Sequence, residues 1–319
     1  MSEQRVLAVM YHYVRDRADT AEAGIRGLET AAFCRQLDRL CASLEPLTWP
    51  MLDAWHGGRG NLPHACFLLT FDDGLADHAQ VVAPILEARG LRGAFFVPGW
   101  VLESGRMDSA HQIHLLQAWM GDGAFAEAVN AWLLDQRPQD DWPGKVDEAE
   151  ARRIYHYESP DRAWVKYLLS HTLPINLRNQ MLGALFTRHV GDPREVAGRW
   201  YLDSEAVVTL AQAGHTIGGH GFNHEPYLRL SAREQVRDFS RCASMLREIL
   251  GPDLRPFSYP YGSFDDGAAW RCHEAGFAQA FTTRPGWIRR NDNVHALHRL
   301  DTIDVDAFLE QELSCPLLH

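Results

Sequence analysis

The sequence predicts an α/β fold built on a mostly parallel sheet. Short apolar segments alternate with amphipathic ones, this alternation stops near residue 100 and resumes near residue 200, and the segment ACFLLTF at 65–71 is apolar throughout. A strand that is apolar on both faces is typical of a parallel sheet covered by helices on both sides. Repeated strand–helix–strand units therefore predict a sheet that is either open or closed into a barrel.

The individual elements follow from apolar spacing and from residues that favour helix ends. Strands are predicted at 5–13, 65–71, 92–99, 215–220, 255–262 and 278–284. Helices are predicted at 30–44, 77–90, 204–214 and 231–251, with a further helix between the last two strands. The helix at 231–251 has the clearest ends, because Ser231 and Glu234 have the spacing of a capping box and Gly251 closes the segment.

Residues 101–200 interrupt this pattern with helical segments rich in Trp, Asp, Gln and Arg. Because the strands resume afterwards, we interpret the segment as a helical insertion or lid within a single domain of residues 1–319. Such helices are equally suited to dimerisation, so a homo-oligomer is the alternative use of the segment.

The bulk composition excludes several classes of partner. A formal net charge of −11 disfavours nucleic-acid binding, which needs a basic surface. No stretch approaches about 18 uninterrupted apolar residues, so no membrane span is expected. The six cysteines include no C-x-x-C pair and are expected to be reduced structural thiols. The N-terminus does not resemble a signal peptide, and the expected location is cytoplasmic.

Two clusters of titratable residues follow predicted strands. Asp72 and Asp73 come directly after the strand at 65–71, and His220 and His224 follow the strand at 215–220. A turn with two acids and a pair of surface histidines are the plain alternatives, since the chain has 16 histidines. The carboxyl ends of parallel strands, however, hold the active sites of barrels and doubly wound sheets.

Two histidines and one carboxylate are suitable ligands for a zinc-type divalent ion with a position left open for water or substrate. Such an ion lowers the pKa of its bound water, and a second carboxylate nearby can accept the proton of that water. One acid as ligand and the other as base would explain why two carboxylates that repel each other are adjacent.

A third segment, RPFSYPYG at 255–262, completes the pattern. Arg255 is expected to keep the catalytic carboxylate ionised through a charge-assisted hydrogen bond. The turn at 260–262 is expected to direct a backbone N–H at a developing oxyanion. A strand-to-helix loop without a catalytic role is the alternative interpretation.

In this order, TFDDG (70–74), HGFNH (220–224) and RPFSYPYG (255–262) resemble the first three motifs of the polysaccharide deacetylases, the NodB-homology group or carbohydrate esterase family four. VMYHYV (9–14) and GAFFVPG (93–99) are also similar to segments common in that group. The resemblance covers roughly residues 1–100 and 200–305. It implies a distorted (β/α) barrel with fewer than eight strands, and metal-dependent hydrolysis of an N-acetyl or O-acetyl group on a sugar.

The resemblance also implies roles for individual residues. The metal ligands of the family match Asp73, His220 and His224. Asp72 matches the general base, Arg255 the residue that orients this base, and Tyr261 the backbone donor to the oxyanion.

Some positions depart from the family pattern. Gly221 replaces the usual Ser or Thr after the first histidine, and Trp287 lies only near the place of the fourth motif. The fifth motif should supply a histidine as general acid, and VHALHRLD offers His298 and, as a close second, His295. His12 ends the first predicted strand and is expected either to line the barrel mouth or to be a buried structural histidine.

The function expected from these residues is metal-dependent removal of an acyl group, N-acetyl before others, from an amino sugar or sugar-containing precursor inside the cell. The expected ion is Zn²⁺, with Co²⁺, Ni²⁺ or Fe²⁺ as alternatives, and the expected substrate is a small-molecule or lipid-linked saccharide. The alternatives are an inactive carbohydrate-binding protein on the same scaffold and an amide hydrolase that acts on a non-sugar metabolite. A non-haem iron oxygenase and a magnesium-dependent phosphatase or glycosyltransferase fit the motifs less well.

Overall fold

The computed structural model describes residues 4–16, 25, 27–136, 146–156, 158–253 and 255–313. The chain divides into two compact units. The first comprises Met1–Asp16, Gly27–Gly105 and Trp200–His319, and the second comprises Arg17–Arg26 and Arg106–Arg199.

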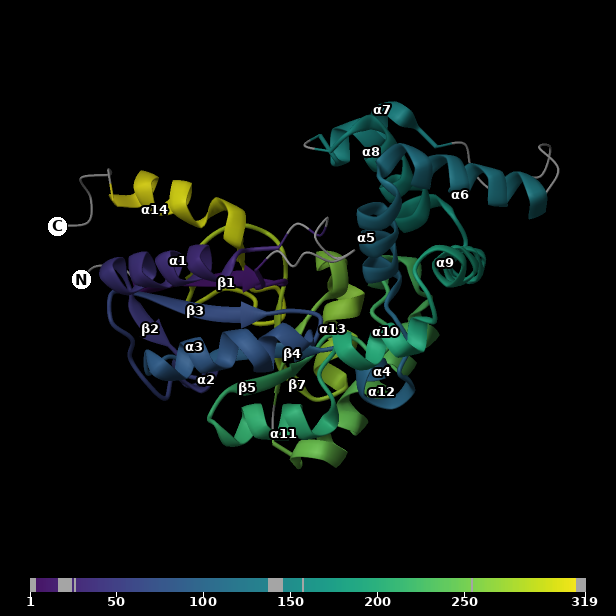
Figure 1. The fold of residues 1–319 in the computed structure, drawn as a ribbon. Coiled ribbons are helices and arrows are strands. Elements are labelled where there is room, and N and C mark those ends of the chain that lie inside the picture. Colours follow the sequence, from purple (N-terminus) through teal and green to yellow (C-terminus); the bar gives the residue numbers. More distant parts are fainter. Residues whose placement is uncertain are drawn as a thin grey trace. The chain divides into compact units, whose positions relative to one another are not determined.

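The first unit is built on a curled sheet of mainly parallel strands (Figure 1). The strands are β1 (Arg5–Tyr11), β2 (Glu45–Leu47), β3 (Ala65–Phe71), β4 (Gly93–Val97), β5 (Thr216–Gly219), β6 (Arg255–Ser258), β7 (Phe277–Phe281), β8 (Ile288–Arg289) and β9 (Leu300–Asp301). Seven of these described strands form the continuous order β7-β6-β5-β4-β3-β1-β8, while β2 pairs with β3 and β9 pairs with β1. The predicted α/β fold, a distorted barrel with fewer than eight strands, is confirmed for this continuous order, which β2 and β9 extend only at its sides.

A short segment near the C-terminus joins the two sides of this sheet. Leu297 forms a bridge to Phe281 at the end of β7, and Leu300 pairs with Val9 of β1. Residues 297–301 therefore link β7 to β1 and bring the first and the later strands together. Neither β8 nor β9 is among the predicted strands, because each contains only two residues.

Helices surround the sheet of the first unit, and Figure 1 shows α1, α3 and α11 on its outside. The longer helices are α1 (Thr30–Ser43), α2 (Trp49–His56), α3 (Ala83–Ala88), α4 (Gly99–Ser104), α11 (Ser204–Gln212), α12 (Ala232–Leu250), α13 (Asp266–Glu274) and α14 (Val305–Leu313). The short turns are η2 (His78–Val82), η5 (Tyr227–Arg229), η6 (Pro260–Gly262) and η7 (Thr302–Asp304). The capping box predicted at the start of α12 is confirmed, since Ser231 and Glu234 each bond the backbone N–H of the other.

The alternation of strand side chains decides what faces the barrel interior. Val6 and Ala8 of β1, with Cys66 and Leu68 of β3, belong to one buried cluster that also contains Leu297. Side chains two residues further along a strand point the same way, so Thr70 and Asp72 continue the inward row of β3. By the same count His12 continues the inward row of β1 beyond Met10. Polar groups are thus placed inside the barrel at the carboxyl ends of β1 and β3.

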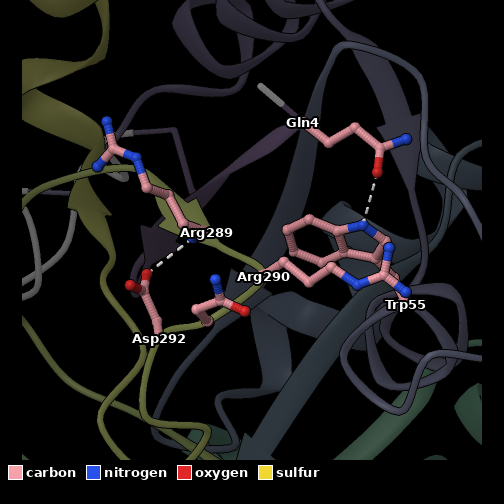
Figure 2. A pocket seen from close by; sticks show the side chains of 6 residues that line it. Gln4, Trp55, Arg289, Arg290 and Asp292 are labelled. Carbon is pink, nitrogen blue, oxygen red and sulfur yellow. Dashed lines mark hydrogen bonds between the residues drawn. The ribbon is translucent and has the colours of Figure 1, made fainter. Parts of the chain in front are cut away.

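A hollow of about 380 Å³ lies at the other end of β1 (Figure 2). Gln4, Trp55 and residues 289–292 line it, and the Trp55 indole Nε1 donates to Gln4 Oε1 over 2.9 Å. Since Gln4 immediately precedes β1, this hollow belongs to the amino ends of the strands. It lies away from the carboxyl ends, where the two predicted clusters of titratable residues are placed.

The second unit is helical in its described part. Its elements are α5 (Ser109–Met120), α6 (Asp122–Gln136), α7 (Glu148–Ile154), α8 (Pro160–Tyr167), η4 (Leu168–Thr172), α9 (Ile175–His189) and most of α10 (Pro193–Trp200). Leu116, Phe125, Val165, Leu182 and Phe186 are buried, so these helices have an apolar core of their own. A role as lid or as dimerisation surface stays a prediction. None of the described helices is long and apolar enough to cross a membrane.

Candidate metal centre and active site

Asp73 leaves β3 in an unusual backbone conformation. Its φ is 79° and that of Gly74 is 62°, both in the left-handed region. Asp adopts this region more readily than most residues, whereas Gly74 is required, because a Cβ there would lie 3.0 Å from Val97 Cγ1. The sharp turn sends the Asp73 carboxylate out of the inward row that Asp72 continues. The two adjacent acids are thereby separated in space.

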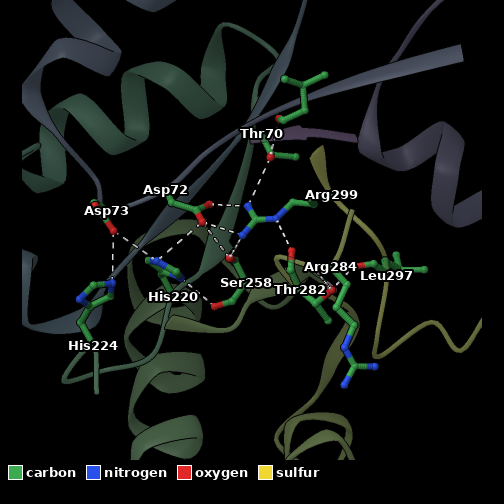
Figure 3. A network of polar contacts seen from close by, with 11 residues as sticks. Thr70, Asp72, Asp73, His220, His224, Ser258, Thr282, Arg284, Leu297 and Arg299 are labelled. Carbon is green, nitrogen blue, oxygen red and sulfur yellow. Dashed lines mark hydrogen bonds and ion pairs between the residues drawn. The ribbon is translucent and has the colours of Figure 1, made fainter. Parts of the chain in front are cut away.

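His220 and His224 meet Asp73 at this edge of the sheet (Figure 3). His220 follows β5, and its Nε2 lies 3.3 Å from Asp73 Oδ1. His224 Nε2 lies 3.2 Å from the same oxygen. All three residues are buried, and their ligand atoms lie within 4.8 Å of one another. The structure thus brings together the three residues that the sequence predicted to bind one ion.

The tautomer of His220 is fixed by its other ring nitrogen. His220 Nδ1 lies 2.7 Å from the backbone oxygen of Ser258, and a carbonyl oxygen only accepts hydrogen bonds. Nδ1 therefore carries the proton, and Nε2 presents its lone pair towards Asp73. A hydrogen bond of this kind is the usual support of a metal-binding imidazole.

The donor set fits a divalent ion. A tetrahedral Zn²⁺ with ligand bonds of about 2.0–2.1 Å separates its ligand atoms by about 3.3 Å. The two distances from Asp73 Oδ1, 3.3 and 3.2 Å, match this separation. Two neutral imidazoles and one carboxylate are also the ligand types that zinc-like ions prefer. Asp73, His220 and His224 would hold the ion.

Asp72 lies beside this cluster but has a different partner. Asp72 is 2% exposed, and Arg299 donates from Nη1 to Oδ1 and from Nη2 to Oδ2, each over 2.7 Å. Ser258 Oγ donates to Oδ2 over 3.1 Å. Burial acts to raise the pKa of Asp72, but the charge of Arg299, assisted by His220, outweighs it and lowers the pKa to about 2. Asp72 is therefore an ionised carboxylate 3.9 Å from His220 Nε2.

Arg299 is the residue that the sequence analysis missed. It is 1% exposed, and Nε donates to Thr282 O over 2.8 Å. The remaining donors also reach Thr70 Oγ1 and Ser258 Oγ, so every N–H of the guanidinium has an acceptor. Arg299 lies on the segment that joins β7 to β1, two residues after the inward Leu297. Its side chain consequently enters the barrel interior from the closing segment.

The prediction that Arg255 holds the catalytic carboxylate is wrong. Arg255 begins β6, and its Nη2 donates to Leu250 O over 3.0 Å. Ser258, at the other end of this strand, is the residue that contacts Asp72. The two residues are three positions apart on an extended strand, which separates them by about 10 Å, since a strand rises about 3.3 Å per residue. Arg255 lies at the amino end of β6, away from the site.

The predicted general acids are also misplaced. His295 Nε2 lies 3.0 Å from Phe277 O, and Phe277 is the first residue of β7, so the ring is at the amino end of the strand. The assignment of His295 as proton donor is therefore wrong. His298 precedes the inward Arg299, and alternation directs its ring to the other face of the segment. There it lies against Gly286, where a Cβ would be 3.2 Å from His298 Nδ1.

His12 is better placed than His295 and His298 to face Asp72. β1 and β3 are parallel with Tyr11 opposite Phe71, and Asp72 N donates to Tyr11 O over 2.9 Å. Continuing this register by one residue places His12 opposite Asp72, on the same inward face. The charge of His12 is close enough to contribute to the lowered pKa of Asp72. The expectation that His12 lines the barrel mouth agrees with this placement.

Tyr261 borders the metal-ligand cluster. Tyr261 is 44% exposed, and its ring centroid lies 5.2 Å from that of His224. Its φ is 58°, and Asp73, His224 and Tyr261 are the three non-glycine residues with positive φ in the described chain. Such conformations cost about 1–3 kcal/mol each and concentrate at functional sites. The role of the Tyr261 N–H as a donor to the oxyanion stays a prediction.

The comparisons with known proteins agree with this geometry. The family model for polysaccharide deacetylase matches residues 181–280, which include both histidines of the cluster and Ser258. The predicted resemblance to the polysaccharide deacetylases is confirmed. The curated relative YxkH of Bacillus subtilis (strain 168) is 22% identical over 107 residues, which are 34% of this chain and 38% of that protein. The matched part thus spans well under half of the relative.

Several solved structures share the fold over nearly the whole chain. The deacetylase PplD of Streptococcus pyogenes, in complex with acetate, has a TM-score of 0.61 at 13% identity, with 97% of this chain and 98% of that chain covered. IcaB of Ammonifex degensii has a TM-score of 0.60 at 17% identity, with 97% of each chain covered. A de-N-acetylase of Aggregatibacter actinomycetemcomitans has a TM-score of 0.55 at 16% identity, with coverages of 93% and 94%. These three solved structures share the fold of this chain.

Replacing Arg299 is expected to destabilise the protein because it leaves the Asp72 carboxylate buried without its cation. Arg299→Met should lower the free energy of unfolding by about 3–5 kcal/mol, measured by urea denaturation. The double variant Asp72→Asn/Arg299→Met should recover part of that loss. Arg255→Met is the control and should cost only about 1 kcal/mol, since it removes a hydrogen bond to a carbonyl. Equal losses in the two single variants would contradict the pairing.

Proposed function

We propose that this protein is a metal-dependent deacetylase that hydrolyses the N-acetyl group of an amino sugar. The observation that supports this most strongly is the separation of two adjacent acids: Asp73 joins His220 and His224, while Asp72 is held ionised by Arg299. A site with three metal ligands, and beside them a second carboxylate that is not a ligand, suits hydrolysis of an amide. The family match and the deacetylase neighbours support the same reaction.

Each residue of the site has its own role in this hydrolysis. A divalent ion held by Asp73, His220 and His224 would lower the pKa of a water molecule and polarise the acyl carbonyl. Asp72 accepts the proton of the attacking water, and Arg299 with Ser258 Oγ orients its carboxylate. The backbone N–H of Tyr261 donates to the acyl oxygen as negative charge develops there.

We assign His12 as the general acid that donates a proton to the departing amine. Asp72 and His12 lie on neighbouring strands and face the same interior, so an acid and a base flank one position. His12→Asn is expected to lower kcat by about 10²-fold or more while the protein keeps its bound metal. Steady-state kinetics with metal analysis of the same samples would measure both. Loss of turnover in His298→Asn instead, with His12→Asn active, would restore the competing assignment.

The substrate class is an N-acetylated saccharide, either a small molecule or a lipid-linked precursor. Two of the structural neighbours support this class, since one is a de-N-acetylase and the other a deacetylase with bound acetate. A cytoplasmic location and an oligomeric state stay predictions.

Release of acetate from a substrate panel tests the proposed function. Protein loaded with Zn²⁺ or Co²⁺ would be incubated with N-acetylated sugar nucleotides, chitin-type oligomers and N-acetylated non-sugar amides. Acetate from either class of sugar, absent after chelation, supports the proposal, and the preferred class identifies the substrate. Acetate only from non-sugar amides would assign an amide hydrolase of another class. Saccharide binding without any acetate would indicate an inactive binding protein.

A further inference from the structure

The loop that carries His224 is attached to a single buried carboxylate. Asp238 of α12 is 4% exposed and accepts four hydrogen bonds from this loop and the turn after it. Oδ2 accepts from Phe222 N over 2.7 Å and Oδ1 from Asn223 N over 2.8 Å. The Asn223 amide donates to Oδ1 over 3.0 Å, and Tyr227 Oη donates to Oδ2 over 2.8 Å. These donors fill the hydrogen-bonding capacity of the carboxylate.

The opposite side of the same loop is held through its carbonyl groups. Gly99 N donates to Gly221 O over 2.9 Å, and Trp100 N donates to Phe222 O over 3.0 Å. The peptide units between the two imidazoles are thus fixed on one side by the start of α4 and on the other by Asp238. His224 follows directly after these bonds, in a left-handed conformation with φ of 55°. An unsupported chain would leave that conformation for a more stable one.

Gly221 shows how closely Asp238 approaches the loop. Its φ is +69°, and a Cβ at this position would lie 3.1 Å from Asp238 Oδ2. The absence of a side chain, which departs from the Ser or Thr usual in the family, allows the carboxylate to reach the backbone N–H groups directly.

We propose that Asp238 is a positioning residue of the metal centre, which holds residues 221–224 in the one conformation that directs His224 Nε2 at Asp73. The inference rests on the proposed function only in that the cluster binds a divalent ion. Asp238 acts through the loop backbone and through His224. Its removal should therefore weaken metal binding, because the ion would first have to order the loop.

The test is the affinity for Co²⁺ and Zn²⁺, measured by competition with a chromophoric chelator, together with the visible spectrum of the Co²⁺ form. Asp238→Asn places an NH₂ group against at least one backbone N–H of the loop, since its single carbonyl oxygen cannot serve both sides. We expect a loss of about 10- to 100-fold in affinity, which is typical when the support of a metal ligand is removed. The Co²⁺ spectrum should lose intensity as the His224 ligand is lost.

Two further variants separate positioning from general destabilisation and from loss of charge. Tyr227→Phe removes one hydrogen bond to Asp238 but keeps both bonds to the loop N–H groups, so its affinity should stay within about 3-fold of the wild type. Gly221→Ala keeps the charge of Asp238 but places a Cβ 3.1 Å from its Oδ2 at a residue with φ of +69°, so it should weaken metal binding through both the displaced carboxylate and the strained backbone. If Asp238→Asn fails to fold, unchanged affinity in Gly221→Ala still overturns the inference.

The outcomes are distinct. Unchanged affinity in Asp238→Asn and Gly221→Ala would overturn the inference and leave the proposed function standing. An equal loss in Tyr227→Phe would also overturn it, because the effect would then follow stability. Weakened binding in the first two variants with no acetate release by the wild type would support the inference and reject the proposed function. A wild type that binds neither ion would reject both.

Discussion

Replacing His224 with Gln is expected to abolish tight metal binding and, with it, all measurable deacetylation. The variant removes one of three ligand atoms that lie within 4.8 Å of one another, and the remaining pair cannot complete the set. The metal content of purified protein, measured by elemental analysis, should fall from about one ion per chain to near zero. Acetate release should fall to the level of chelated wild-type protein.

An exposed histidine supplies the control for this substitution. His273 lies on α13 with its ring 5.2 Å from that of His295, so His273→Gln changes the same residue type away from the cluster. It should keep both the ion and the activity. Wild-type metal content in His224→Gln would contradict the proposed centre, whatever the activity of that variant.

The second large effect is expected for Asp72→Asn. The amide is similar in size to the carboxylate but cannot accept the proton of the attacking water, so kcat should fall by about 10²- to 10⁴-fold. Metal affinity should change little, because the ligand atoms belong to Asp73, His220 and His224. Kinetics and metal titration on one preparation would check both expectations.

Asp73→Asn is the matched comparison, because it makes the same chemical change at the adjacent residue. It should lose the ion together with activity, whereas Asp72→Asn should lose activity alone. If both variants bound metal equally and kept activity within about tenfold of the wild type, neither acid would have its proposed role.

Much of this site could be predicted from the sequence because its signals are local. Asp72 and Asp73 end a continuous apolar strand, and His220 and His224 directly follow a short one. Parallel strands place their carboxyl ends at one edge of the sheet, so residues about 150 positions apart in the chain were expected together. The positions of the main strands along the chain followed from the same apolar pattern.

Arg299 could not be predicted in this way, because its contact depends on how the barrel closes. It lies 227 positions from Asp72, on a segment that contains only a two-residue strand. The available signal was the alternation of Leu297, Arg299 and their neighbours, which places a charged residue on an inward face. Selecting His295 and His298 by residue type, and Arg255 by its proximity to a motif, overlooked that alternation.

His12 illustrates a different limit. Its position at the end of β1 was visible in the sequence, but its neighbour was not, because the strand order that places β1 beside β3 depends on the whole sheet. Only the register, with Tyr11 opposite Phe71, brings His12 to Asp72.

The route of residues 297–301 also determines which shortened chains can work. A polypeptide cut after residue 280, where the family match ends, would retain both imidazoles and both acids at the sheet edge. It would lack the guanidinium that neutralises Asp72. It would also lack the segment that pairs with both β7 and β1. The boundary suggested by homology therefore falls inside the proposed active site, and fragment libraries or fusions should keep the chain intact at least through β9.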